Sequence, residues 1–293
     1  RVRAADYAAA LRRALERART GNGPSALRDA LLAELDLVEI RLDKPFLVSG
    51  YFEPRIPGAR HPGGRFTQAL YLPPPDLRRG VPHLPRAEID SGGALAGRHL
   101  ELCFVDPLDA FVLQTEGGGT VDLDDGTALP LDHAGTNNRA HVRIGQFLEK
   151  DLAPDKRNWP GMEEHLRRLP ERALRDVLER NPRYSFFRPR ANAAAGPNTA
   201  LGIPATAERT IATDGTLLPR GALGFLFTEV PQVDQSGATN WRESNRFVLD
   251  EDAGGAIRGA RIDLYFGSGA EAGRAAGVMK RPGRLFYFVP RSR

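Results

Sequence analysis

The sequence predicts a mainly β protein with helical decoration, and three observations support this class. Short apolar runs separated by turn residues recur over most of the chain. Glycine (31) and proline (23) are both above average usage, which favours short strands and turns over long helices. Clear helical periodicity occurs mainly in the first 40 residues and again over 161–181. We therefore expect β-barrel-like domains that carry a few helices.

The N-terminal 40 residues are predicted to form two helices. In ADYAAALRRALERAR (5–19), apolar residues recur at the i, i+3, i+4, i+7 spacing of an amphipathic helix. Gly21 and Gly23 interrupt this pattern, which then resumes. KPFLVSGYFEP (44–54) predicts a strand, and the turn-rich segment 55–66 is interpreted as a crossing between two domains.

Short strands and turns are predicted from residue 66 to 147. The strand candidates are FTQALYL (66–72), HLELCFV (99–105), DAFVLQT (109–115) and GTVDLDDGTALPL (119–131), the last with an Asp-Gly hairpin signal at 125–126. Two helices follow over 161–181, the second starting at Pro170. Then come a strand over 182–189, a second crossing over 190–202, and strands alternating with glycine turns to the C-terminus.

Bulk composition excludes several classes of protein. The net charge of +4 arises from 41 basic and 37 acidic residues that are interspersed, whereas a dedicated nucleic-acid binder shows a basic stripe. No run approaches the roughly 20 apolar residues of a membrane span. Cys103 is the single cysteine and the six histidines lack compact ligand spacing, so we expect no disulfide, metal or cofactor. The chain starts at Arg1 without Met, so a signal peptide or lipid anchor would lie outside it.

Two motif-like stretches are better explained by local structure. GSGAEAG (267–273) follows a strand but has G-x-G-x-x-x-G spacing, which predicts a strand-to-helix turn in place of a dinucleotide site. DLDDG (122–126) lacks calcium-loop spacing and predicts a hairpin turn. No G-x-S-x-G occurs, and Cys103 lies in an apolar run, so nucleophilic Ser or Cys catalysis has no support.

Carboxylates are the remaining candidates for chemistry. In ARIDLYFG (260–267), alternation places Ile262, Leu264 and Phe266 on one face of a strand and Asp263 on the other. Asp263 could be a solvated strand residue, although strands disfavour aspartate. Alternatively, the glycines of AGGAIRG (253–259) could bring Asp252 beside it, and two close carboxylates raise one pKa, as a general acid for glycosidic cleavage requires.

A family resemblance favours the catalytic interpretation. EDAGGAIRGARIDLYFGSGAEAG (251–273) resembles the signature of the membrane-bound lytic murein transglycosylase A family, whose three aspartates match Asp214, Asp252 and Asp263. Five more blocks occur in the family's order: SGYFEP (49–54), RAEID (86–90), VDPLDAFVLQTEGGG (105–119), NPRYSFF (181–187) and EVPQVD (229–234).

The resemblance implies a fold and a reaction. The fold is a double-psi β-barrel formed by residues 1–60 and 195–293, with a smaller β-rich domain over 61–194 inserted and a glycan-binding groove between the two. The reaction is non-hydrolytic cleavage of the β-1,4 bond between N-acetylmuramic acid and N-acetylglucosamine, which leaves a 1,6-anhydromuramoyl end. Asp263 would act as acid and then as base, with Asp252 tuning or orienting it, while Asp214 either holds a barrel turn or helps to bind substrate.

Further expectations follow from the resemblance. Candidate substrate-binding residues are Tyr51, Phe52, Gln114, Gly117, Gly118, Gly119, Asp214 and Tyr265. Gly118 replaces a usual serine, and His133, Thr136 and His141 replace two tyrosines and a lysine, which bears on subsite contacts more than on the chemistry. The implied location is the periplasm, with an outer-membrane anchor outside this chain, and the implied partners are peptidoglycan strands and proteins of cell-wall synthesis or division. A non-catalytic glycan-binding or scaffold protein and a peptidoglycan hydrolase are the alternatives.

Overall fold

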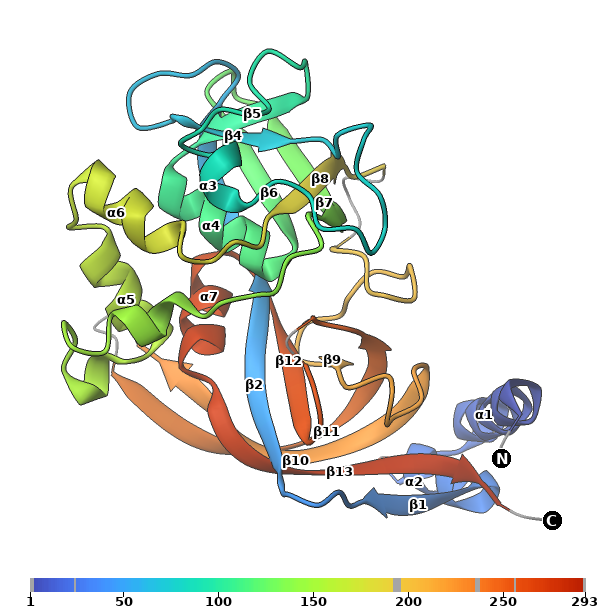
Figure 1. The fold of residues 1–293 in the computed structure, drawn as a ribbon. Helices are drawn as coiled ribbons and strands as arrows, with labels where there is room; N and C mark the ends of the chain where they lie inside the picture. The colour runs from blue at the N-terminus through green and yellow to red at the C-terminus, as the bar shows by residue number, and fades with distance from the viewer. Residues whose placement is uncertain (1–2, 24, 192–195, 235–237, 256, 292–293) are drawn as a thin grey trace.

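A computed structural model describes residues 3–23, 25–191, 196–234, 238–255 and 257–291. The larger of its two sheets has seven strands, in the order β1-β13-β10-β11-β9-β12-β2. Their bounds are β1 Leu35–Ile40, β2 Phe46–Glu53, β9 Thr210–Ala212, β10 Ala222–Val233, β11 Thr239–Asp252, β12 Arg261–Ser268 and β13 Lys280–Pro290. The sheet lies in the lower half of Figure 1 and joins segments from both ends of the chain.

This sheet closes into a barrel because β2 pairs on both of its edges. It runs parallel to β12 and antiparallel to β13, and β13 in turn pairs with β10. Alternate residues of the strands fill the interior with fully buried side chains, among them Val48, Leu226, Ile262 and Leu285. The predicted mainly β fold, a double-psi barrel with a second domain, is confirmed.

The second sheet has six strands in the order β4-β5-β3-β6-β7-β8. Their bounds are β3 Arg55–Ala59, β4 Gln68–Tyr71, β5 Glu101–Val105, β6 Gly118–Leu123, β7 Ala128–Thr136 and β8 Ser185–Pro189. The predicted hairpin is present, since β6 and β7 pair antiparallel around Gly126, whose φ of 82° suits glycine. Cys103 is buried in the apolar core of this sheet.

One predicted strand is wrong. Residues 109–115 belong to helix α4 (Pro107–Glu116), whose side chains are buried along most of its length. The sequence carries the helix signals at its ends: Asp106 accepts hydrogen bonds from the first-turn amides, Pro107 occupies the first turn, and Gly117 ends the helix at φ 87°. A helix buried on all sides shows no amphipathic period, which is why its apolar run resembled a strand.

The chain passes from one sheet to the other at Pro54, earlier than predicted. Residues 55–59, interpreted as part of a turn-rich crossing, form β3 at the centre of the second sheet. Thr120 N donates to Pro54 O at 2.8 Å, which ties β6 to the point of passage. The return crossing lies between β8 and β9, and residues 192–195 of it fall outside the described part. The exact domain limits stay a prediction.

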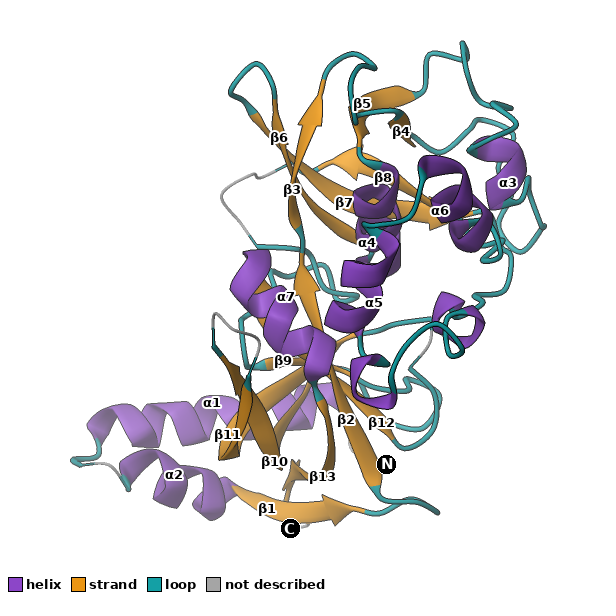
Figure 2. Ribbon diagram, turned by 90° about the vertical axis from the view of Figure 1, so that its left-hand side faces the viewer, coloured by secondary structure: helices purple, strands orange, loops and turns teal. Residues whose placement is uncertain are grey.

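Helices cover both sheets and the junction between them (Figure 2). The N-terminal pair, α1 (Ala4–Thr20) and α2 (Ala26–Glu34), packs through Ala10, Ala14 and Leu31 against β13, as the apolar periodicity predicts. Helix α3 (Arg86–Ile89) packs on the six-stranded sheet through Ile89. The 3-10 turn Ile144–Phe147, α5 (Trp159–Leu166) and α6 (Glu171–Leu178) pack on α4, and a second 3-10 turn spans Pro154–Lys156. Helix α7 (Gly269–Val278) follows β12, as the strand-to-helix turn predicted, and packs on β2.

Candidate active site

Asp263 lies at the centre of β12 with its side chain directed away from the barrel core. Its neighbours Ile262 and Leu264 are fully buried in that core, so the predicted alternation holds here. On the parallel strand β2, Ser49 is its register partner, and Ser49 Oγ donates a hydrogen bond to Asp263 Oδ1 at 2.6 Å. Arg261 Nε donates to the same hydroxyl at 3.0 Å. Asp263 is therefore positioned by a polar chain that spans two strands.

The surroundings of Asp263 favour its protonated form. Burial raises the pKa of this carboxyl, and the charge of Asp252 raises it further. The hydrogen bond from Ser49 and the charge of Arg261 act in the opposite direction, but the pKa remains above its ordinary value. A carboxyl with a raised pKa is suited to donate a proton near neutral pH.

Asp252 sits at the end of β11 and is held by three donors. Tyr51 Oη donates to its Oδ2 at 2.6 Å, while the backbone amides of Ala200 and Ala253 donate to its Oδ1 at 3.0 and 2.8 Å. Burial raises the pKa of Tyr51 above its ordinary range, and the charges of Asp252 and Asp263 raise it further. The Tyr51 hydroxyl thus stays protonated and donates its hydrogen bond to Asp252.

The short strand β9 brings these two aspartates together. Its residue Ala212 pairs with Asp252 of β11 on one side and with Asp263 of β12 on the other. A register shift between Asp250 and Asp252 accompanies the first pairing. The glycines of 253–259 were expected to bring the carboxylates together, but strand pairing through β9 does so.

Asp214 follows β9 and has a different environment. Its Oδ2 accepts Gly259 N at 2.8 Å, and its Oδ1 accepts the amide and hydroxyl of Thr216 at 3.1 and 2.7 Å. These hydrogen bonds, with that of Gly259 first, lower the pKa of Asp214, whose side chain is buried. Because its acceptor positions are occupied by the two turns that it joins, the geometry supports a structural role for Asp214.

Glu116 is a further carboxyl near this centre, and sequence reasoning missed it. Glu116 is the last residue of α4, and its Oε2 accepts Phe52 N of β2 at 3.3 Å. Burial raises the pKa of Glu116 to about 8, and the charge of Asp263 contributes to the rise against the effect of the Phe52 amide. Glu116 lies within the quoted block VDPLDAFVLQTEGGG, where an acid directly before three glycines was the available signal.

Two protein-family models match this chain, one over the segment that includes the six-stranded sheet and one over the C-terminal part of the barrel. Residues 47–188 match the MltA specific insert domain and residues 209–289 match the 3D domain. The lytic transglycosylase LtgG of Burkholderia pseudomallei is 35% identical, with coverage of 97% of this chain and 85% of that structure and a TM-score of 0.65. This chain belongs to the membrane-bound lytic murein transglycosylase A family.

Other members extend the comparison. Membrane-bound lytic murein transglycosylase A of Vibrio cholerae is 34% identical over 82% of this chain, and that of Escherichia coli K12 is 33% identical over 81%. This chain spans 64% of the length of each of these relatives. The structure of E. coli MltA with bound chitohexaose has a TM-score of 0.81, at 27% identity, 98% coverage of this chain and 84% coverage of that one.

The aromatic residues expected to bind sugar in this family member differ in accessibility. Tyr51 and Phe52 are half-buried, and Tyr51 engages Asp252. Phe52 packs on α7, where a Cβ added to Gly273 would lie 2.8 Å from its ring. Tyr265 is 3% exposed, with its ring 5.2 Å from that of Tyr51, so it supports Tyr51 from the interior and offers no surface to a sugar.

Gln114 and the glycines after α4 have structural surroundings. Gln114 is 5% exposed in the interior beside Tyr184, which argues against direct contact with a glycan. A Cβ on Gly119 would lie 2.6 Å from Pro54 O, so glycine permits the close approach of β6 to the crossing. A Cβ on Gly118 would lie 2.8 Å from Leu131 O, so a serine there would require a backbone shift. Gly117 ends α4.

Three replacements of usual family residues, His133, Thr136 and His141, fall on the insert, and Arg183 acts on the two histidines. Burial and the charge of Arg183 lower the pKa of His133 and of His141, so both rings are neutral at pH 7. Thr136 Oγ1 accepts the amide of Asn138 at 3.3 Å. A Cβ on Gly255 would lie 3.4 Å from the Arg183 guanidinium, so Arg183 reaches the barrel loop that follows Asp252. The insert therefore contacts the barrel at the loop after Asp252 and, through Glu116, at Phe52 of β2.

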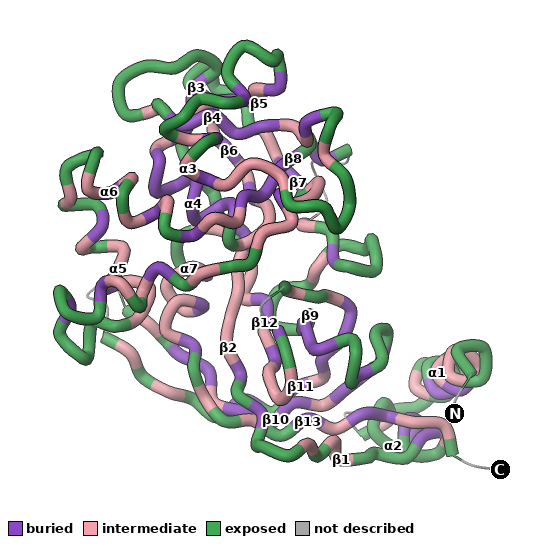
Figure 3. The backbone as a smooth tube through the Cα atoms, in the orientation of Figure 1, coloured by how far each residue is buried: buried purple, intermediate pink, exposed green. Residues whose placement is uncertain are grey.

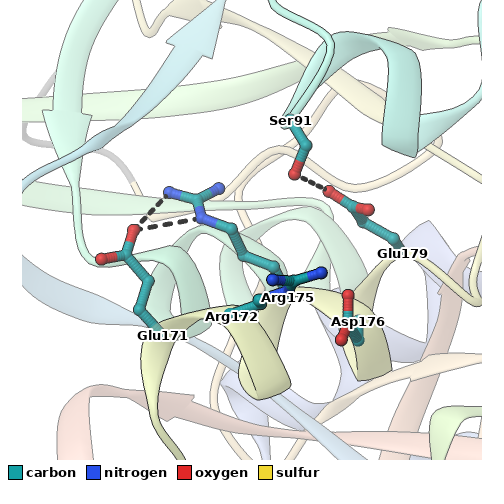
Figure 4. A pocket seen from close by; sticks show the side chains of 6 residues that line it. All are labelled: Ser91, Glu171, Arg172, Arg175, Asp176 and Glu179. Carbon is teal, nitrogen blue, oxygen red and sulfur yellow. Dashed lines mark hydrogen bonds and ion pairs between the residues drawn. The ribbon is translucent and has the colours of Figure 1, made fainter.

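Two surface hollows lie on the insert, away from the aspartates. Figure 4 shows the first, where Arg175 pairs with Glu171 and Ser91 donates to Glu179. The second, about 280 Å³, opens beside Thr115, His141 and Trp159. Among the described residues, no three His, Cys, Asp or Glu side chains gather as a metal ion would require. No helix of the described segments is long and apolar enough to cross a membrane.

Proposed function

We propose that this protein is a lytic transglycosylase that cleaves the β-1,4 bond between N-acetylmuramic acid and N-acetylglucosamine in peptidoglycan and forms 1,6-anhydromuramoyl ends. The observation that carries the proposal is the raised pKa of Asp263 within a polar centre built by β2, β11 and β12. Relatives named lytic murein transglycosylase and the chitohexaose complex of E. coli MltA support the substrate class.

One carboxyl is enough for this reaction because the sugar supplies its own nucleophile. Protonated Asp263 donates to the leaving glycosidic oxygen as the anomeric carbon–oxygen bond breaks. The Asp263 carboxylate then accepts the proton of the C6 hydroxyl, whose oxygen bonds to the anomeric carbon and closes the anhydro ring. The proton balance is restored at the end, and neither water nor an enzyme nucleophile enters, unlike the two-carboxylate hydrolases.

Asp252 and Ser49 would keep Asp263 ready for both steps. The charge of Asp252 favours proton retention on Asp263 before cleavage, while the Ser49 hydroxyl stabilises the carboxylate that forms afterwards. We also propose that the protein acts in the periplasm and is anchored to the outer membrane, since the proposed substrate is peptidoglycan and the relatives are named membrane-bound. Proteins of cell-wall synthesis or division are the proposed partners.

Product analysis tests the function directly. Purified peptidoglycan is digested with the native protein and with the Asp263→Asn variant, and the soluble fragments are identified by mass spectrometry. We expect 1,6-anhydro ends from the native protein only. Reducing ends would indicate a hydrolase, and binding to peptidoglycan without any cleavage would indicate a non-catalytic glycan-binding protein.

A further inference from the structure

Glu116 holds a fixed position at the junction of the two sheets. It is the last residue of α4, and Gly117 closes the helix through its amide, which donates to Leu113 O at 3.0 Å. Three residues after Gly117, Thr120 N of β6 donates to the carbonyl of Pro54, which directly follows β2. Backbone contacts therefore fix the main chain around Glu116, and the hydrogen bond from Phe52 N, at 3.3 Å, holds its carboxyl.

The carboxyl of Glu116 retains most of its hydrogen-bonding capacity. In the described segments its sole donor is the Phe52 amide, at 3.3 Å, whereas Asp252 has three donors. The residue is half-buried and not closed off from solvent. A carboxyl in this state has one oxygen and one proton available to a ligand.

The charges around Glu116 define its state during the reaction. Asp263 on β12 is the charged group that acts on it, and Asp263 is in turn influenced by Arg261 and by Asp252. With a pKa raised to about 8 by burial and by the charge of Asp263, Glu116 remains protonated at pH 7 after Asp263 has lost its proton. A neutral carboxyl donates a hydrogen bond, and the hydroxyl and acetamide oxygens of an amino sugar are acceptors.

We propose that Glu116 is a further residue of the reaction centre, which binds the sugar at the scissile bond as a hydrogen-bond donor from the insert side, facing Asp263. The inference rests on the proposed transglycosylase function and adds a donor to it. Glu116 ends helix α4 of the insert, whereas Asp263 belongs to the barrel, so a sugar that binds both would contact the insert and the barrel at once.

The variants Glu116→Gln and Glu116→Ala test this role, with Glu164→Gln as an exposed control on the same part of the chain. The measured quantity is the rate of anhydromuramoyl end formation from purified peptidoglycan between pH 6 and 9.5. Glutamine keeps the donor and can still accept the Phe52 amide, so its rate at pH 7 should lie within about 2-fold of the native rate. Alanine should lower kcat/KM by about 2- to 12-fold, the range for one hydrogen bond.

The pH profile separates this role from a merely structural one. With a pKa of about 8, roughly one-tenth of native Glu116 is protonated at pH 9, whereas glutamine does not titrate. Because the deprotonated fraction loses the same hydrogen bond as the alanine variant, the ratio of the Glu116→Gln rate to the native rate should rise from about 1 at pH 7 to about 2–6 at pH 9. A ratio that stays flat, or an alanine variant as active as the native protein at pH 7, overturns the proposal. Absence of anhydro products from the native protein would instead overturn the transglycosylase function itself.

Discussion

Replacing Asp263 by asparagine should abolish turnover without weakening the fold. Asparagine matches the carboxyl in size, and its amide oxygen can still accept the Ser49 hydroxyl, which now lies 2.6 Å from Asp263 Oδ1. The variant can neither donate the acid proton nor accept the C6 hydroxyl proton. Loss of general acid–base catalysis corresponds to a rate decrease of about 10²- to 10⁴-fold, or about 3–5 kcal/mol in the activation free energy.

The same substitution, which lowers activity, should leave the thermal stability at pH 7.5 unchanged or raise it. The folded-state pKa of Asp263 is raised, so the folded protein binds this proton more tightly than the unfolded chain does. Stability therefore falls as pH rises from the unfolded pKa of about 3.9 through the folded pKa, and the ionised carboxylate is a cost above that interval. Asparagine removes this cost, so the Tm of Asp263→Asn should equal or exceed the native Tm at pH 7.5.

Two measurements check this prediction, with Asp36→Asn as the exposed control. Thermal unfolding is followed by circular dichroism at pH 4 and pH 7.5, and anhydromuramoyl ends are quantified under initial-rate conditions. The Tm of the native protein should fall further below that of Asp263→Asn at pH 7.5 than at pH 4. The Tm of the Asp36→Asn control should change with pH as that of the native protein does. A variant that melts below the native protein at pH 7.5 would contradict the raised pKa of Asp263, and one that keeps more than about a tenth of the native activity would contradict its acid–base role.

Three further substitutions have distinct expected outcomes. Tyr51→Phe removes one of the three donors to Asp252 and should lower the free energy of unfolding in urea by about 1–3 kcal/mol; an unchanged midpoint would contradict that contact. Asp214→Asn should lower the Tm at pH 6, because the lowered folded-state pKa of Asp214 stabilises the fold where the carboxyl is ionised. The difference in Tm from the native protein should close as pH falls below about 4. A difference that does not depend on pH would exclude a contribution from the charge of Asp214. Arg190→Ala leaves the buried carboxylates of Glu53 and Asp132 without their cation and should cost about 3–5 kcal/mol of unfolding free energy; a loss below about 1 kcal/mol would contradict a close buried pair.

The extent to which each element is buried explains why some helices and strands could be predicted from the sequence and others could not. β12 has one face in the barrel core and one in the polar centre, so its alternation is visible in the sequence. Most residues of α4 are buried, as the colouring in Figure 3 shows, and the sequence of this helix accordingly has no polar face to mark the helical period. β3 was obscured by Pro57 and Gly58, residues that usually indicate a turn.

The roles of the carboxylates were likewise predictable from the sequence only in part. Asp252 and Asp263 are 11 positions apart and share one quoted block, so their importance could be inferred from the sequence together with a family resemblance. The means by which they meet could not, because Ala212 of β9 lies outside that block and pairs with both. Glu116 is still more distant in the chain, and its relation to Asp263 exists only because α4 ends against β2.

Local chemistry in the chain was enough to establish a mainly β molecule, its hairpin, its terminal helices and two candidate carboxyls, since each depends on residues close in sequence. The protonation of those carboxyls depends on burial and on charges brought from other strands, which are properties of the folded assembly. Only the tertiary structure placed Ser49, Tyr51 and Glu116 around Asp263, because three segments far apart in the chain must converge before that environment exists.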